Sequence, residues 1–314
     1  MEGGEEVRGK EHMPEPYEKQ CFSNFKDLND ELGRAEFDEW WVFRAQPADP
    51  PLKTTLERCC EKWELATWAH EIEEIMIREF RRVYEGEDLQ TVRNDTLYCL
   101  SLLRHYGAPA RLLDFTYSKY VALYFGLEYA YESGKQENTS KTHDVDRSFA
   151  IWCINTKQLT LRVRKNYENC QDFLRHVNAR ADVETRDDCS FIPLYMKNEY
   201  NLAISESPAI IHKRHHLQQS VFLCPGNVKV SFMDNLLHVS SNTQKLKGIK
   251  KFTCKLILSE FRDMFEEFRR MNITRESLFP GLDGLAQSMK YQACFYKDMY
   301  ERIKQGRQGF KELE

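Results

Sequence analysis

The sequence predicts an α+β fold, in which helices flank a central mixed or antiparallel β-sheet and further helices are added at both ends. Apolar and β-branched runs with the length of strands occur along the whole chain, and segments with helical periodicity lie between them. The two kinds of segment do not alternate strictly, as they would in a parallel βαβ fold. The length of 314 residues, with 41% hydrophobic and 30% charged residues, is typical of a globular chain.

The first quarter of the chain contains one predicted strand between two predicted helices. Residues 1–20 are polar, which predicts a disordered tail. A short helix is expected over 22–32, and the aromatic and β-branched run at 40–44 predicts a strand. Apolar residues between 65 and 83 recur at helical spacing with charges between them, so this segment is predicted to be an amphipathic helix that faces the core.

Two helices are predicted around a Gly-x-Pro turn. The first is capped at residues 94–95 and ends near Gly107, because Pro109 prevents its continuation. The second covers 120–131, with Ser118 as its expected N-cap. Because this second helix is apolar on nearly every side, it should be deeply buried.

The rest of the chain mixes strands and helices. Strands are predicted at 149–154, 207–211, 220–224 and 252–258. Helical patterns cover 165–190, 261–271 and 282–304. We therefore expect one main domain over 21–295, followed by a C-terminal helical extension over 296–314.

Composition excludes several classes of protein. The formal net charge of −4 gives no global basic field for nucleic acid. No apolar run reaches the roughly 20 residues that span a bilayer, and the start of the chain lacks the features of a secretory signal. The ten cysteines are scattered without a Cys-x-x-Cys pair, which favours a reduced, cytoplasmic chain. The histidines at 212–216 lack ordered Cys or carboxylate partners, so no metal is expected.

The segment 104–118 is the strongest candidate for a ligand site. Its donors and titratable groups, including His105, Arg111 and Asp114, surround the turn between the two predicted helices. This composition predicts a site that binds an anionic or sugar-bearing ligand. The alternatives are structural: Asp114 could cap a turn or pair with an arginine, and His105 could pack at the helix end.

Arg44 is a second candidate, at the end of a predicted strand. Its guanidinium suits a phosphate or carboxylate, and a structural ion pair with Asp114 is the alternative. Lys213 and Arg214 could add positive potential to the same cleft.

Four blocks of the chain resemble the FRG-domain family, which is named for a Phe/Tyr-Arg-Gly motif. They are Trp-Val-Phe-Arg-Ala-Gln at 41–46, His-Tyr-Gly-Ala-Pro-Ala-Arg-Leu-Leu-Asp-Phe-Thr at 105–116, a segment with Gln-Gln-Ser-Val-Phe at 214–222, and Leu-Phe-Pro-Gly-Leu-Asp-Gly-Leu-Ala at 278–286. Alanine at 45 and 110 and serine at 220 stand where the family usually has Gly, Thr and Gly. The resemblance implies that 21–295 is an FRG domain.

The order of these blocks is similar to that of NAD-dependent ADP-ribosyltransferases. The similarity implies an ADP-ribosyltransferase-like core, NAD as ligand, and Arg44, Thr116 to Ser118 and Gln218 or Gln219 on successive strands. The implied catalytic residues are Arg44, His105 and Gln219. The implied cofactor-binding residues are Arg44, Tyr106, Arg111, Asp114, Thr116 and Ser118. Because an amide cannot supply negative charge, Glu206 is a possible substitute carboxylate.

The expected function is cleavage of the nicotinamide glycosidic bond, with transfer to a protein, a nucleic acid or water. The alternative is a non-enzymatic module for regulation or defence that binds a nucleotide or nucleic acid through Arg44, Arg111 and Arg214. A third hypothesis is phosphodiester cleavage by His105 and Asp114. No membrane partner is expected.

Overall fold

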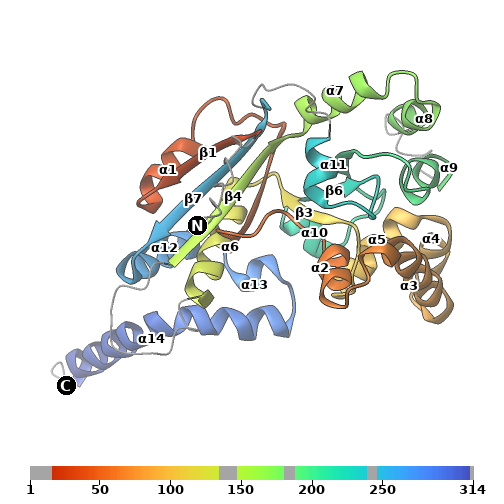
Figure 1. Ribbon diagram of the computed structural model, residues 1–314. Coiled ribbons are helices and arrows are strands. Elements are labelled where there is room, and N and C mark those ends of the chain that lie inside the picture. The colour runs from red at the N-terminus through yellow and green to blue at the C-terminus, as the bar shows by residue number, and fades with distance from the viewer. Residues whose placement is uncertain (1–15, 134–146, 180–187, 239–245, 312–314) are drawn as a thin grey trace, which may run out of the picture.

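The computed structural model describes residues 16–133, 147–179, 188–238 and 246–311. Within these ranges the chain forms one seven-stranded mixed sheet surrounded by helices, which confirms the predicted α+β class (Figure 1). The strands lie in the order β1-β7-β4-β2-β3-β6-β5. Their bounds are β1 (Glu18–Phe22), β2 (Trp41–Pro47), β3 (Leu113–Thr116), β4 (Arg147–Asn155), β5 (Ala203–Glu206), β6 (Ser220–Pro225) and β7 (Ile249–Leu256).

All neighbouring strands are antiparallel except β1 and β7, which are parallel. The helices are α1 (Phe25–Leu32), α2 (Thr55–Lys62), α3 (Ala69–Val83), α4 (Leu89–Asn94), α5 (Thr96–His105), α6 (Lys119–Ser133), α7 (Thr156–Asn166), α8 (Gln171–Ala179), α9 (Asp188–Phe191), α10 (Lys213–Leu217), α11 (Phe232–Leu237), α12 (Leu258–Arg270), α13 (Arg275–Leu278) and α14 (Leu282–Lys311). A 3-10 turn (Ala66–Trp68) precedes α3, and a π-helical turn (Ile192–Met196) follows α9.

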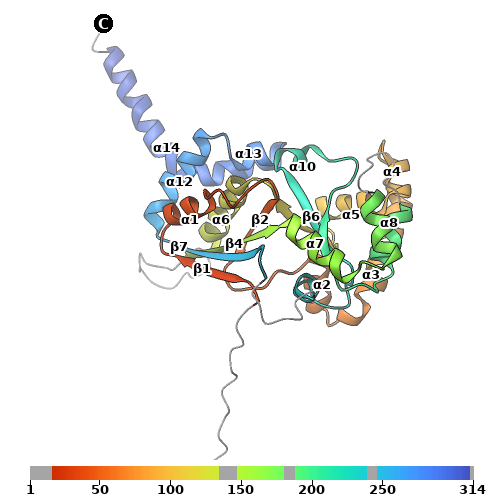
Figure 2. The same cartoon turned by 90° about the horizontal axis from the view of Figure 1, so that it is seen from above.

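The core consists of three large clusters, one of which joins β2, β3, β4 and β6 in the middle of the sheet to α7 and α11. Another joins α1, α6 and α12 to β2, β4 and β7, and the third joins α3, α5, α8 and α9 to β5 and β6. Helix α6 lies close to β4, because a Cβ at Gly126 would meet the Phe149 ring at 2.4 Å. The C-terminal part of α14 projects away from this body (Figure 2).

Apart from the one expected over 165–190, the predicted helices are present, and the two around the turn are buried as expected. Helix α5 ends at His105, and Gly107 adopts a φ of 87°, which glycine tolerates without strain. The chain then enters β3, which pairs with β6 and, through Phe43, with β2. This route brings the segment 104–118 to the middle of the sheet.

Three expected segments differ. Residues 18–22, assigned to the tail or the first helix, form edge strand β1, because they pair with β7 and Glu18 forms an ion pair with Lys250 at 3.2 Å; residues 1–15 lie outside the described ranges. The strand expected at 207–211 is a loop, since β5 ends before Pro208, which has no N–H for a ladder.

The helix expected over 165–190 is interrupted: α7 ends at Asn166, α8 covers Gln171–Ala179, and residues 180–187 lie outside the described ranges. At the C-terminal end, the expected boundary between 295 and 296 lies inside α14, which is one continuous helix.

Candidate functional site

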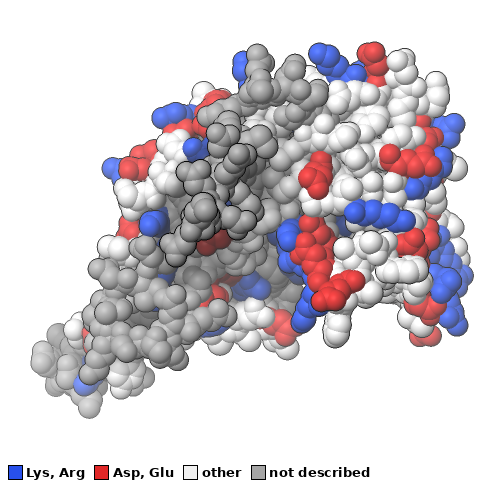
Figure 3. All heavy atoms as spheres, in the orientation of Figure 1, with Lys and Arg blue, Asp and Glu red and all other residues white. Residues whose placement is uncertain are grey.

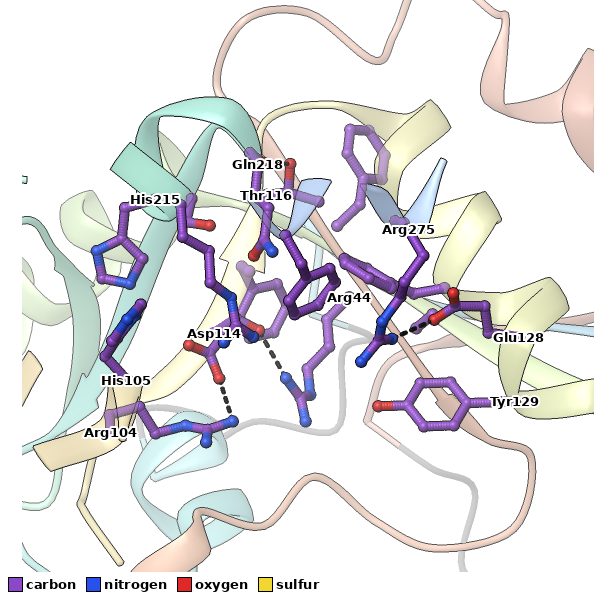
Figure 4. A pocket seen from close by; sticks show the side chains of 18 of the residues that line it. Arg44, Arg104, His105, Asp114, Thr116, Glu128, Tyr129, His215, Gln218 and Arg275 are labelled. Atoms are coloured by element: carbon purple, nitrogen blue, oxygen red, sulfur yellow. Dashed lines mark hydrogen bonds and ion pairs between the residues drawn. The ribbon is translucent and has the colours of Figure 1, made fainter. Parts of the chain in front are cut away.

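A cavity of about 360 Å³ lies where β2, β3 and the start of β6 meet α5, α6, α10, α13 and α14. This volume is within the range of small-molecule pockets, roughly 300–1,000 Å³. Arginine, histidine and acidic side chains enter it from several of these elements, together with aromatic rings (Figure 4). The cavity is therefore both strongly charged and partly apolar.

Arg44 reaches the cavity from β2, where it pairs with Trp152 of β4. Its Nη1 donates to the backbone carbonyl of Asp114 at 2.8 Å, and its buried Nε has no hydrogen-bond partner. Burial lowers the pKa of Arg44, although an arginine stays charged at neutral pH. A charged hydrogen-bond donor that is unpaired at the wall of a cavity suits an anionic ligand.

Asp114 is held by a different arginine. Its Oδ2 accepts from Arg104 Nη2 at 2.5 Å, so the sequence-based alternative of an Arg44–Asp114 carboxylate pair is wrong. Burial raises the pKa of Asp114, but the guanidinium groups of Arg104 and Arg44 outweigh it, and the pKa lies below its ordinary value. Asp114 is therefore an anion that fixes one wall of the cavity.

The opposite wall carries a second ion pair and an aromatic ring between two arginines. Arg275 Nη1 donates to Glu128 Oε2 at 2.6 Å. The Phe279 ring centre lies 3.9 Å from the Arg275 guanidinium carbon and 4.1 Å from that of Arg214. Such stacking holds planar guanidinium groups in place without neutralising them.

The charges at the cavity do not cancel. Three carboxylates line it, and each has a cationic partner: Asp114 with Arg104, Glu128 with Arg275, and Glu132 with Lys290. Among the described residues, Arg44 and Arg214 have no carboxylate within ion-pair distance. The cavity is thus left with two uncompensated positive charges.

Two histidines at the cavity add little to this charge at neutral pH. Burial lowers the pKa of His105, and so does the nearby Arg214. Burial also lowers the pKa of His215, to about 4. His212 stacks between His105 and Tyr98, with ring centres 5.3 and 5.4 Å away. Neutral imidazoles can accept a hydrogen bond as well as donate one.

Four of the sequence-predicted site residues meet at this cavity: Arg44, His105, Asp114 and Thr116. Thr116 is 5% exposed, and its hydroxyl donates to the backbone carbonyl of Gln218 at 2.6 Å and accepts from the N–H of Ser118 at 3.0 Å. Thr116 therefore ties β3 to the start of β6 at the floor of the cavity.

Gln219 does not line the cavity, whereas Gln218 does. After α10, Gln219 turns into the left-handed region with a φ of 48°, which leaves its side chain exposed before β6 begins. Gln218 is 8% exposed, and its Nε2 donates to the carbonyl of Leu278 at 3.0 Å. The structure thus puts Gln218 where Gln219 was expected.

Arg111 lies elsewhere, fully buried in a pair with Glu73. Its Nε donates to Glu73 Oε2 at 2.7 Å and its Nη1 to the carbonyl of Tyr195 at 2.6 Å. Because these contacts occupy the guanidinium, Arg111 does not face the ligand cavity.

Two other expected ligand contacts and the substitute carboxylate also lie away from the cavity lining. Tyr106 is 72% exposed. Ser118 Oγ accepts from the N–H of Val121 at 3.3 Å, as an N-cap would. Glu206 is buried and accepts from Tyr195 at 2.6 Å, so it cannot replace Gln219 at the cavity.

The sequence analysis did not find Glu128 and Arg275. Glu128 carried one available signal, because it is the only ionisable acid in the apolar segment 120–131 and a carboxylate in a buried helix needs a partner. Arg275 carried no such signal, since its role depends on where α13 packs.

An FRG domain model matches residues 39–135, so the chain carries an FRG domain there. The match contains β2 with Arg44, the segment 104–118 and α6 with Glu128. No curated protein and no solved structure matches the chain.

The part of the chain that the structure describes shows neither a group of metal ligands nor a membrane-spanning helix. No three His, Cys, Asp or Glu side chains gather as a metal-binding group there. No helix in that part has the length and apolarity to cross a membrane.

Proposed function

We propose that the cavity binds NAD through its phosphates and that the protein acts on the nicotinamide glycosidic bond. The observation that carries the proposal is the pair of guanidinium groups, Arg44 and Arg214, that lack carboxylate partners within the described part of the chain, at a cavity with aromatic walls. A diphosphate supplies the missing negative charge, and aromatic rings such as Tyr129 offer surfaces for a base or a pyridine ring.

The strand order supports NAD as the nucleotide. Strands β2, β3 and β6 are neighbours, and they carry or adjoin Arg44, Thr116 and Gln218 in that order. The resemblance to ADP-ribosyltransferases implies the same order: an arginine, a strand that carries hydroxyl groups, and a glutamine. Likeness of arrangement alone does not establish a reaction, so binding and turnover need separate measurements.

Calorimetric titration of the full chain with NAD tests the proposal. Removing a charged hydrogen bond costs about 1.5–3 kcal/mol, so Arg44→Ala should weaken NAD binding roughly 10- to 100-fold. Arg34→Ala is the matched control, because Arg34 is an exposed arginine paired with Glu31 and lies outside the cavity. Absence of NAD binding by the wild-type chain at millimolar ligand would contradict the proposal.

Binding without turnover, as a regulatory or defence module, is the second candidate. The observation in its favour is Gln218, because a neutral amide cannot supply negative charge to a cationic sugar. Release of free nicotinamide, measured by chromatography, separates the two functions. A nucleic acid is a weaker candidate as ligand, since basic and acidic side chains are interspersed over the described part of the face in Figure 3.

A further inference from the structure

We propose that Glu128 is the general base of this site and that it activates water for attack on the ribose carbon of bound NAD, which makes the reaction a hydrolysis. This inference rests on the proposed function, because it takes NAD to be the ligand of the cavity. It assigns the catalytic role to a carboxylate on α6 and not to Gln218, which lies just before β6.

The two carboxylate oxygens of Glu128 have different surroundings. The residue is 5% exposed and lines the cavity. Its Oε2 is bonded to Arg275 (Figure 4). The Tyr124 hydroxyl also adjoins this carboxylate, but no group in the described part of the chain makes a hydrogen bond of good geometry to its buried Oε1. A buried acceptor without a partner is unfavourable unless a ligand or water completes it. Oε1 is therefore a positioned acceptor for a group that enters the cavity.

The other carboxylates of the cavity are less suited to this role. Arg104 holds Asp114 and, with Arg44, lowers its pKa, which makes it a weaker base. Glu132 is less buried than Glu128 and is paired with Lys290. Burial instead raises the pKa of Glu128, although Arg275 and a hydrogen bond with Tyr124 oppose the shift, and a base whose pKa is nearer the working pH is more effective.

The proposed hydrolysis consumes NAD and one water molecule. The bond between the ribose carbon and the nicotinamide nitrogen breaks, and its electron pair neutralises the pyridinium ring. The oxygen of one water molecule bonds to the positively charged ribose carbon. A proton of that water passes to Oε1 of Glu128 and then to solvent, leaving ADP-ribose and nicotinamide. Arg275 is a positioning residue, because it fixes the carboxylate through Oε2.

Nicotinamide release from NAD by the full chain is the test, with NAD affinity measured in parallel. Glu128→Gln should reduce the release rate about 10²- to 10⁴-fold, the usual contribution of a general base. NAD affinity should stay the same or increase, because the substitution removes a negative charge beside a polyanion. Glu31→Gln is the matched control: it also removes a nearly buried carboxylate from a pair with an arginine, but on α1.

The outcomes separate this inference from the proposed function. No NAD binding by the wild-type chain defeats the proposed function and the inference with it. Binding with an unchanged release rate in Glu128→Gln overturns the inference alone. Binding without any release in the wild type overturns the inference and leaves only the NAD-binding part of the proposed function. If Glu128→Gln fails to fold by circular dichroism, Glu128→Asp replaces it. Glu128→Asp should keep a residual rate of nicotinamide release. The acidic limb of its plot of rate against pH should shift relative to that of the wild type, and an unshifted limb overturns the inference.

Discussion

His215 illustrates, at the scale of single residues, how burial changes a side chain that titrates near neutral pH in water. Its ring packs edge-on against Phe222 with 4.7 Å between ring centres, and burial is the largest cause of its lowered pKa. Asp114 acts in the opposite direction, while His212, His105 and Arg214 lower the pKa further. His215 is therefore neutral in the folded protein over most of the acidic range.

The pH dependence of stability tests this state. The folded pKa of about 4 lies below the ordinary 6.5, so between these values the unfolded chain binds a proton that the native chain does not. Stability should fall as the pH drops from about 6.5, by about 3 kcal/mol once the pH is below about 4. Urea unfolding at pH 7 and pH 5 measures the loss, and His215→Gln should lose less than the wild type. Equal losses in both proteins would show that His215 is protonated in the native state.

At the scale of secondary-structure elements, the pair of Glu73 and Arg111 connects α3 to the segment that enters β3. Glu73 Oε1 also accepts a hydrogen bond from the backbone N–H of Arg111 at 3.0 Å, so one carboxylate fixes both the side chain and the backbone of Arg111. Both residues are fully buried. The arginine predicted to bind the ligand instead holds in place the segment that leads into β3, the strand that carries Asp114.

Removing one partner of this pair should be costly. Glu73→Ala leaves the Arg111 guanidinium buried without its carboxylate, which destabilises proteins by about 3–5 kcal/mol. Glu79→Ala, an exposed glutamate on the same helix, should cost less than about 1 kcal/mol. Chemical denaturation compares the two, and the double variant Glu73→Leu with Arg111→Met should recover much of the loss. Similar stabilities for Glu73→Ala and Glu79→Ala would contradict this role.

At the scale of the whole molecule, the segment that matches the FRG domain model does not contain its own sheet. Residues 39–135 include β2 and β3, which are joined to each other by the single bridge of Phe43 and Thr116. The long pairing of β2 is with β4, and that of β3 is with β6, both outside the matched segment. The sheet therefore depends on strands spread over the whole chain.

This topology predicts that residues 39–135 expressed alone will not fold. Two strands with one bridge leave most of their N–H and C=O groups unpaired, and an isolated pair of strands is marginal at best. The amide spectrum of the fragment by nuclear magnetic resonance should lack the dispersion of a folded protein, in contrast to that of the full chain. A dispersed spectrum with cooperative unfolding would show that the matched segment is an independent domain.

An element could be predicted from the sequence when the residues that specify it are close together in the chain. Helices α3, α5 and α6 were found because their apolar spacing is a property of neighbouring residues. Strand β1 was not predicted and β3 was implied only by the family resemblance, since each is short and is stabilised by partners more than 50 residues away.

The residues of the cavity could likewise be predicted only in part. Arg44, His105, Asp114 and Thr116 could be proposed because chemically distinctive residues sit beside predicted elements. The choice between Gln218 and Gln219 could not be made, because a one-residue difference at the left-handed turn decides which side chain is buried.

The sequence by itself determined the α+β class, the buried helices and a segment that contributes four polar side chains to the cavity, because residue spacing and residue type act locally. Only the tertiary structure decided the charge of the site. It paired Arg111 with Glu73 and Arg104 with Asp114, and among the residues that the structure describes it left Arg44 and Arg214 without carboxylates. The physical reason is that an ion pair depends on distances between side chains, and packing sets those distances between residues far apart in the chain.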